Sequence, residues 1–336
     1  MPTMRFAQAI DHALAQVMAE DDRIVILGED VHAIRRELLV RFGERRVRST
    51  PISESAFLGA AVTAAMGGLR PVVEVMLVDF LGVAMDALLN HAAKVAALSG
   101  GRWNAPLVVR TSCGGGYGDG GQHEQSLWGW LAHIPGLAVV VPSCPADAGG
   151  LMLAAINHGG PVIFLEHKLL AENWLAWMGV GGRRGLRIDV PAAGARGSVP
   201  SRWKALPVGK AAILRRGEDV TLVSLGVGVH RAIEASKALR RRGISAEVID
   251  LRWVAPLDVE TVRASVRSTG RLLVIDEDYE CCGLSGELAA LMLEAGMGPR
   301  YARVCTRSTI PYARHLEDQV LPSVGRILDA AQTLLA

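Results

Sequence analysis

Short apolar runs of strand length alternate with longer segments of helical periodicity along most of this chain. Residues 23–28, 71–76 and 107–110 are runs of the first kind, and helical segments lie between them. This alternation indicates a mostly parallel sheet that is covered by helices. It stops between about residues 171 and 207, where Gly, Pro, Arg and Trp are frequent, and then begins again. We therefore predict an α/β fold of two domains, each a mostly parallel sheet flanked by helices.

The same pattern places the individual elements and the domain limits. Helices are predicted at residues 6–18, 54–67, 80–98, 146–157, 230–242, 259–269, 285–295 and 318–335, the second with Ser53 as its N-cap. Further strands are predicted at residues 137–141, 162–165, 220–225, 246–251, 271–275 and 302–305. The domains are then residues 1–175 and 206–336, joined by a linker at 176–205. Within the irregular stretch we expect an ordered part that is anchored by tryptophan.

The charge balance and the cysteine content exclude several classes of protein. Lys and Arg number 36 and Asp and Glu 34, a net charge of +2 that gives no basis for binding nucleic acid or a membrane surface. Arginine clusters such as Arg35-Arg36 are interpreted as solvated faces. No signal peptide or membrane-spanning run is legible. The 5 cysteines, among them the adjacent Cys281 and Cys282, fit buried and reduced thiols. We therefore expect a cytoplasmic protein.

Two segments carry the residues best suited to chemistry. Glu54 begins a helix rich in Ala and Gly, where free backbone N–H groups stabilise a carboxylate. From spacing alone, an ordinary first-turn glutamate is the simpler interpretation. Residues 113–121 are rich in glycine, so their backbone must turn tightly or approach another group closely. This segment leads to His123, which could act as an acid, a base or a hydrogen-bond donor.

Several short motifs occur in an order that is typical of one protein family. They are Ile26-Leu27-Gly28-Glu29-Asp30-Val31, Thr50-Pro51-Ile52-Ser53-Glu54, Arg70-Pro71 through Glu74, Phe80 through Lys94, Gly116-Tyr117-Gly118 with His123 and Gln125, Pro135-Gly136-Leu137 with Val140-Val141-Pro142, Leu206 through Ala211, and Ile310-Pro311-Tyr312-Ala313 before Leu316-Glu317-Asp318. In this order the chain resembles the beta subunit of the thiamine-diphosphate-dependent first component of 2-oxo acid dehydrogenase complexes, the family of pyruvate, branched-chain and acetoin dehydrogenases. The fold implied is a transketolase-like pyrimidine-binding domain followed by a transketolase C-terminal domain.

The resemblance implies an α2β2 heterotetramer that decarboxylates a small 2-oxo acid, or cleaves acetoin, and passes the acyl unit to the lipoyl group of a transacylase. Glu54 matches the glutamate that hydrogen-bonds N1′ of the thiamine diphosphate pyrimidine, and Met76 and Phe80 match residues that pack on that ring. His123 matches the histidine near the reacting carbonyl. Glu29 matches an acidic residue of the polar passage between the two cofactors.

The metal is expected mainly in the alpha subunit, which supplies the diphosphate side of the site. Gly118-Asp119-Gly120 looks like the start of the family motif for Mg²⁺, but the next Asn, Asn157, is too distant to complete it. No zinc motif is legible, and Asp276-Glu277-Asp278 is interpreted as solvated loop charge. Residues 155–160 lie where some family members bind K⁺ through backbone carbonyls. We therefore assign no metal ligand to a side chain of this chain.

Departures from the family pattern leave the acyl acceptor open. The family usually has His-Ser-Gln where this chain has His123-Glu124-Gln125, so an inward Glu124 would interact with the histidine and an outward one would be surface. The loop after Asp30 is shorter than usual, and residues 81–83 are less polar. One alternative is a two-chain transketolase or carboligase that transfers its two-carbon or acyl unit to another acceptor. The other is a non-catalytic partner subunit.

Overall fold

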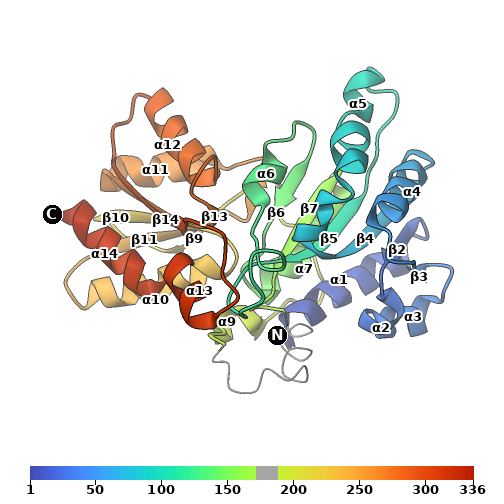
Figure 1. The fold of residues 1–336 in the computed structure, drawn as a ribbon, viewed down its shortest axis with the longest axis horizontal. Helices are drawn as coiled ribbons and strands as arrows, with labels where there is room; N and C mark the ends of the chain where they lie inside the picture. The colour runs from blue at the N-terminus through green and yellow to red at the C-terminus, as the bar shows by residue number, and fades with distance from the viewer. Residues whose placement is uncertain (172–187) are drawn as a thin grey trace.

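The computed structural model describes residues 1–171 and 188–336, which form two large sheets that lie side by side (Figure 1). A further two-stranded antiparallel sheet pairs β1 (Thr3–Arg5) with β8 (Arg196–Ser198). Parallel pairing dominates both large sheets. The α/β class predicted from the alternation is therefore confirmed.

The first large sheet has the strand order β12-β6-β7-β5-β4-β2-β3. The strands are β2 (Ile24–Gly28), β3 (Val47–Ser49), β4 (Arg70–Leu77), β5 (Val108–Cys113), β6 (Ala138–Val140), β7 (Val162–His167) and β12 (Trp253–Ala255). Only β12, which comes from the C-terminal half of the chain, pairs antiparallel to its neighbour, β6. Because parallel strands end at the same edge of a sheet, the segments that follow β2, β4 and β5 lie together.

Helices flank this sheet because their apolar residues repeat with the helical period. They are α1 (Phe6–Glu20), α2 (Val31–Ile34), α3 (Arg36–Phe42), α4 (Glu54–Met66), α5 (Val95–Leu98), α6 (Trp128–Ala132) and α7 (Pro145–Asn157). In α1, Phe6, Ile10, Leu14 and Met18 recur at four-residue spacing, and all four are fully buried. This apolar face packs α1 against α7.

The second large sheet has the order β14-β13-β10-β11-β9. Its strands are β9 (Ala212–Arg215), β10 (Val220–Ser224), β11 (Ala246–Asp250), β13 (Arg271–Tyr279) and β14 (Arg300–Thr306). The helices of this half are α9 (Ala192–Ala195), α10 (Val227–Arg240), α11 (Val259–Thr269), α12 (Leu284–Glu294), α13 (Arg314–Val320) and α14 (Val324–Leu335). Figure 1 shows α13 near the junction of the two sheets.

All predicted strands correspond to observed ones, but two predicted helices are wrong in their continuity. Residues 80–98 form a 3-10 turn, η1 (Val78–Gly82), a π-helical turn, η2 (Ala87–Ala92), and α5. Backbone hydrogen bonds there span three residues from Val83 N to Phe80 O and five from Ala93 N to Leu88 O, so no single α-helical ladder runs through the segment. Apolar periodicity does not distinguish these turns from one helix.

The predicted helix at residues 318–335 is also divided. Pro322 has no N–H to donate and disfavours helical backbone at the preceding residue, so α13 ends at Val320. A new helix, α14, then begins with Ser323 as its N-cap, and the Ser323 hydroxyl accepts from Arg326 N at 3.3 Å. Strands of three or four residues, such as β1, β3, β9 and β12, were not predicted, because a segment this short does not show a recognisable apolar period.

The Trp-anchored part of the irregular stretch is confirmed at Trp203, which is 2% exposed. Its indole Nε1 donates to His12 Nδ1 at 2.9 Å, and its backbone N–H donates to Gln16 Oε1 at 2.9 Å. These contacts fix residue 203 on α1. Residues 172–187, which include the first part of the predicted linker, lie outside the described residues. The domain limits 1–175, 176–205 and 206–336 stay a prediction.

Two predictions about exposure are wrong. Arg35, taken for a solvated side chain, is 6% exposed and pairs with buried carboxylates. Cys281 and Cys282, taken for buried thiols, are exposed in the turn after β13, whereas Cys113 and Cys305 are buried as expected. In the parts of the chain that the structure describes, no helix is both long and apolar enough to cross a bilayer.

Candidate active site

The residues singled out from the sequence gather at the carboxyl edge of the first sheet. Glu29 follows β2 directly, Met76 is the second-to-last residue of β4, and Phe80 lies in η1 just beyond it. The glycine-rich loop that leads to His123 follows β5. Glu54 begins α4, which follows β3. Four segments far apart in sequence are thus brought to one edge by the parallel arrangement of their strands.

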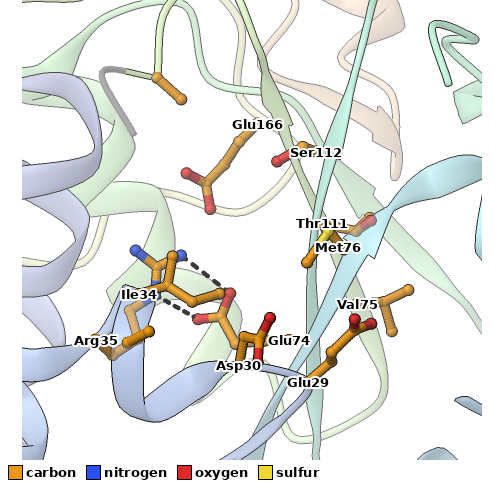
Figure 2. Close-up of a pocket in the computed structure, with 12 residues that line it drawn as sticks. Glu29, Asp30, Ile34, Arg35, Glu74, Val75, Met76, Thr111, Ser112 and Glu166 are labelled. Carbon is orange, nitrogen blue, oxygen red and sulfur yellow. Dashed lines mark hydrogen bonds and ion pairs between the residues drawn. The ribbon is translucent and has the colours of Figure 1, made fainter. Parts of the chain in front are cut away.

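A cavity of about 390 Å³ opens at this edge (Figure 2). It is lined by Glu29, Asp30, Ala33, Ile34, Arg35, Glu74, Val75, Met76, Thr111, Ser112, Glu166 and Ala171. Two of the predicted site residues, Glu29 and Met76, therefore share one cavity. Glu54, Phe80 and His123 are not among its lining residues.

A buried ionic network forms one wall of this cavity, and sequence reasoning missed it. Arg35 Nε and Nη2 donate to the two oxygens of Glu74 at 2.9 and 3.0 Å, as Figure 2 shows. Arg110, which is 0% exposed, pairs with Glu166 through Nε and Nη2 and with Asp11 Oδ1 through Nη1 at 2.7 Å. The signal was a charged residue in the interior of each of three apolar strands, β4, β5 and β7.

Glu54 and Glu29 are close enough to interact electrostatically. Burial, followed by the charges of Asp30 and Glu54, raises the pKa of Glu29 above its usual value. The start of α4 is held by Ser55, whose hydroxyl donates to Val83 O at 2.6 Å. Ser53 is the N-cap residue as predicted, although its side chain makes no capping hydrogen bond. The Glu54 carboxylate has no hydrogen bond or ion pair with any residue in the described ranges.

Phe80 and His123 form a second group beside the first. Their rings meet edge to face, with centroids 5.9 Å apart and an interplanar angle of 80°. Residues close to them in the sequence are also linked: Gln125 Nε2 donates to Asp79 Oδ1 at 2.8 Å, and Tyr279 Oη donates to Gln125 Oε1 at 3.0 Å. Across the described residues, His123 Nδ1 and Asp79 Oδ2 are buried without a hydrogen-bond partner.

The backbone N–H groups of the glycine-rich loop point at three buried carboxylates. Gly115 N donates to Glu277 Oε1 at 2.9 Å, and the N–H groups of Gly116 and Gly118 donate to Glu317. Tyr117 N and Gly120 N donate to Glu124 at 2.8 and 3.0 Å. Glycine is required at several of these positions. At Gly114, where φ is +92°, a Cβ would lie 2.1 Å from His167 Nε2.

The structure corrects one sequence interpretation here and decides another. Asp276-Glu277-Asp278 is not solvated loop charge: β13 runs through it, and Glu277 is 5% exposed. Burial alone would raise the pKa of Glu277, but His167, Arg231 and the Gly115 N–H lower it to about 2. Glu124 points inward and is 0% exposed. It bonds to the loop backbone rather than to the imidazole of His123.

The donor set suits part of an aromatic nitrogen heterocycle rather than a metal. No group of three or more His, Cys, Asp or Glu side chains that could hold a metal ion occurs in residues 1–171 and 188–336. A half-buried carboxylate without a partner, Glu54, stands near a cavity whose wall includes the thioether of Met76. Such a carboxylate can accept a hydrogen bond from a protonated ring nitrogen, and Met76 and Phe80 offer apolar surface to a ring.

Comparisons with known proteins find similarity to transketolase-like proteins along nearly the whole chain. The family model of the transketolase pyrimidine-binding domain matches residues 2–173, and that of the transketolase C-terminal domain matches residues 209–327. A split-gene transketolase, solved as an inactive beta4 tetramer, has a similar fold, with a TM-score of 0.78 at 21% sequence identity over 99% of this chain and 98% of that chain.

Closer relatives are beta subunits of dehydrogenases. The beta subunit of acetoin:2,6-dichlorophenolindophenol oxidoreductase of Cupriavidus necator is 38% identical over 96% of this chain and 95% of its own. The beta subunit of the pyruvate dehydrogenase E1 component of Rhizobium meliloti is 38% identical over 99% of this chain and 70% of its own. The 2-oxoisovalerate dehydrogenase subunit beta of Bacillus subtilis is 37% identical over 88% of this chain and 85% of its own. This chain therefore belongs to the family of transketolase-like dehydrogenase beta subunits.

Proposed function

We propose that this chain is the beta subunit of a thiamine-diphosphate-dependent enzyme that decarboxylates a small 2-oxo acid, or cleaves acetoin, and transfers the acyl unit to a lipoyl group. The observation that carries the proposal is the placement of Glu54, a half-buried carboxylate without a protein partner in the described residues, at the start of α4 beside the acidic cavity. Family membership supports the same reaction.

Each residue of the site has a distinct proposed role. Thiamine diphosphate, when bound, supplies the carbon nucleophile and the electron sink of the reaction. The Glu54 carboxylate accepts a hydrogen bond from the N1′ position of the pyrimidine ring and so fixes which ring tautomer is bound. Met76 and Phe80 pack against the ring and exclude water from it. Glu29, whose pKa is raised by burial, can hold a proton within the polar passage.

His123 is proposed to face the substrate. Its Nδ1 is buried without a hydrogen-bond partner in the described residues, so it is available to a carboxylate or carbonyl oxygen of the substrate. The edge-to-face contact with Phe80 limits the rotation of the imidazole. The acyl group would leave this site on the lipoyl arm of a transacylase.

An alpha subunit in an α2β2 heterotetramer is proposed to complete the site with the diphosphate-binding side and Mg²⁺. The N–H groups of Gly118 and Gly120, which could otherwise bind an anion, already donate to Glu317 and Glu124. This use of the loop backbone supports a diphosphate site on the other chain. K⁺ bound by carbonyls of residues 155–160 remains a further proposal, and Asn104 Nδ2 donates to one of these carbonyls, at Gly159.

The test is 2-oxo acid-dependent reduction of an artificial electron acceptor by the chain alone and by the chain co-expressed with an alpha subunit. We expect activity only in the mixture, and a loss of about a hundredfold or more in Glu54→Gln, because general acid–base groups contribute on that scale. Glu294→Gln, at an exposed position at the end of α12, is the matched control. Full activity in Glu54→Gln would favour a non-catalytic partner subunit instead.

The acceptor is tested on the same complex. Transfer to free lipoamide and transfer to an aldehyde are measured side by side with each 2-oxo acid. Acyl transfer to lipoamide is the expected result. Aldehyde transfer without lipoamide transfer would support the two-chain transketolase or carboligase instead.

A further inference from the structure

The carboxyl groups of Glu124 and Glu317 hold alternate residues of the glycine-rich loop. Glu124 accepts from Tyr117 N and Gly120 N, and Glu317 accepts from Gly116 N and Gly118 N. Both side chains are 0% exposed. Glu317 belongs to α13 of the C-terminal half, whereas Glu124 follows the loop directly. The loop backbone is thus fixed from both halves of the chain.

The two carboxyl groups are close enough for the charge of Glu317 to act on Glu124. A second negative charge nearby disfavours ionisation of a buried carboxyl group. Burial, followed by the charge of Glu317, raises the pKa of Glu124 to about 8. Glu124 therefore keeps its proton at neutral pH.

Positive groups face this pair from two other directions. Arg314 Nη1 of α13 lies 3.3 Å from Glu317 Oε2. Lys168, which follows β7 and is 1% exposed, donates through Nζ to the backbone oxygen of His123. Its Nζ also lies 5.2 Å from the ring centroid of Tyr117. The charged and titratable groups around Glu124 are therefore Glu317, Arg314, Lys168 and Tyr117.

We propose that Glu124 is a positioning residue for His123: the carboxyl groups of Glu124 and Glu317 fix the glycine-rich loop, and the loop together with Lys168 fixes the backbone from which the imidazole projects. Glu124 acts through this backbone and not on the substrate. A further backbone hydrogen bond supports this positioning role, because His123 N donates to Gly120 O at 3.0 Å while Gly120 N donates to Glu124. The inference rests on the role of His123 in the proposed function.

The first test is amide hydrogen exchange of the full chain over residues 113–125. In Glu124→Ala, Tyr117 N and Gly120 N lose their acceptors, so we expect exchange there to accelerate by roughly tenfold to a hundredfold. Glu124→Gln keeps one acceptor oxygen, so its acceleration is smaller. Glu294→Gln is the control, with no expected change. Unchanged exchange in Glu124→Ala would overturn the inference.

The second test is steady-state kinetics of the complex with its alpha subunit. Glu124→Ala should lower kcat by roughly tenfold to a hundredfold with little change in KM, because a displaced group costs rate more than binding. In the unmodified chain, kcat should decline as the pH rises through about 8, where Glu124 loses its proton and its charge repels Glu317. Glu124→Gln cannot lose that proton, so this decline should be absent.

The outcomes separate this inference from the proposed function. If Glu124→Ala does not fold, Glu124→Gln still provides the pH test, and an unchanged alkaline decline would refute a role of Glu124 in that decline. Faster loop exchange with an unaltered kcat would refute the positioning of His123. His123→Ala is measured in parallel. If that variant is fully active, the role of His123 in the proposed function fails, whatever the exchange data show for the loop.

Discussion

Removing Arg110 should destabilise the first sheet strongly, and removing one of its partners as well should restore part of the loss. The buried network contains three carboxylates, Asp11, Glu74 and Glu166, and two guanidinium groups, Arg35 and Arg110, so its formal charge is about −1. Arg110→Met changes that charge to about −2, and no water enters to hydrate the extra negative charge. Breaking a buried ion pair on one side costs about 3–5 kcal/mol, and we expect a loss of that size in the free energy of unfolding.

The double variant Arg110→Met/Glu166→Gln returns the formal charge to about −1, because Gln is neutral. Burial already raises the pKa of Glu166 although Arg110 lowers it, so this carboxyl gains most from neutralisation. We expect the double variant to be about 1–3 kcal/mol more stable than Arg110→Met. Urea titration of the unmodified chain, Arg110→Met, Glu166→Gln and the double variant measures this. Exposed Arg240→Met is the control, which should change stability by less than about 0.5 kcal/mol. A loss below about 1 kcal/mol in Arg110→Met, or strictly additive effects in the double variant, would refute the reasoning.

Three further predictions concern single positions. Glu277 has a pKa of about 2, below its ordinary value of 4.5, so its contribution to stability is present above pH 4.5 and is lost as the pH falls to 2. In Glu277→Gln, the free energy of unfolding should therefore depend less on pH in that window. Gly114→Ala would place a Cβ 2.1 Å from His167 Nε2 at a φ of +92°, so thermal melting should show a loss of about 3 kcal/mol or more, and an unchanged melting temperature would contradict it. The thiols of Cys281 and Cys282 should react with an aromatic disulfide reagent well before the buried thiols, and equal rates would show that this turn is covered.

Apolar periodicity was sufficient for the strands and for most helices, because burial on a sheet or on one helix face imposes a regular spacing. It failed where hydrogen bonding changes without a change in hydrophobicity. Within residues 80–98, Leu81, Leu88 and Ala92 stay buried while the backbone passes from a 3-10 turn to a π-helical turn. Pro322 did carry a local signal, and the division between α13 and α14 could have been placed there from the sequence.

The sequence shows which charged residues lie in the apolar strands of the site, but it does not show which of them pair. Glu74, Arg110 and Glu166 are visible as charged residues in the interior of apolar strands, yet their pairing depends on the strand order β7-β5-β4. Sequence spacing does not reveal that order, nor the register that sets Glu74 opposite Arg110. Arg35 was misjudged for the same reason, since its partner lies 39 positions away in the sequence. Motif resemblance supplied what periodicity could not, namely the roles expected for Glu54 and His123.

The glycine-rich loop makes the C-terminal half part of the candidate site. Of the loop N–H groups that donate to carboxylates, those of Gly115, Gly116 and Gly118 use Glu277 or Glu317 from that half, and only Tyr117 and Gly120 use Glu124. A loop rich in glycine has high conformational entropy when free, so its single conformation depends on these acceptors. The imidazole of His123 is therefore oriented by contacts made across the junction of the two sheets. A change in the packing of the two halves would therefore alter the orientation of the His123 imidazole through this loop, without altering any residue that touches the substrate.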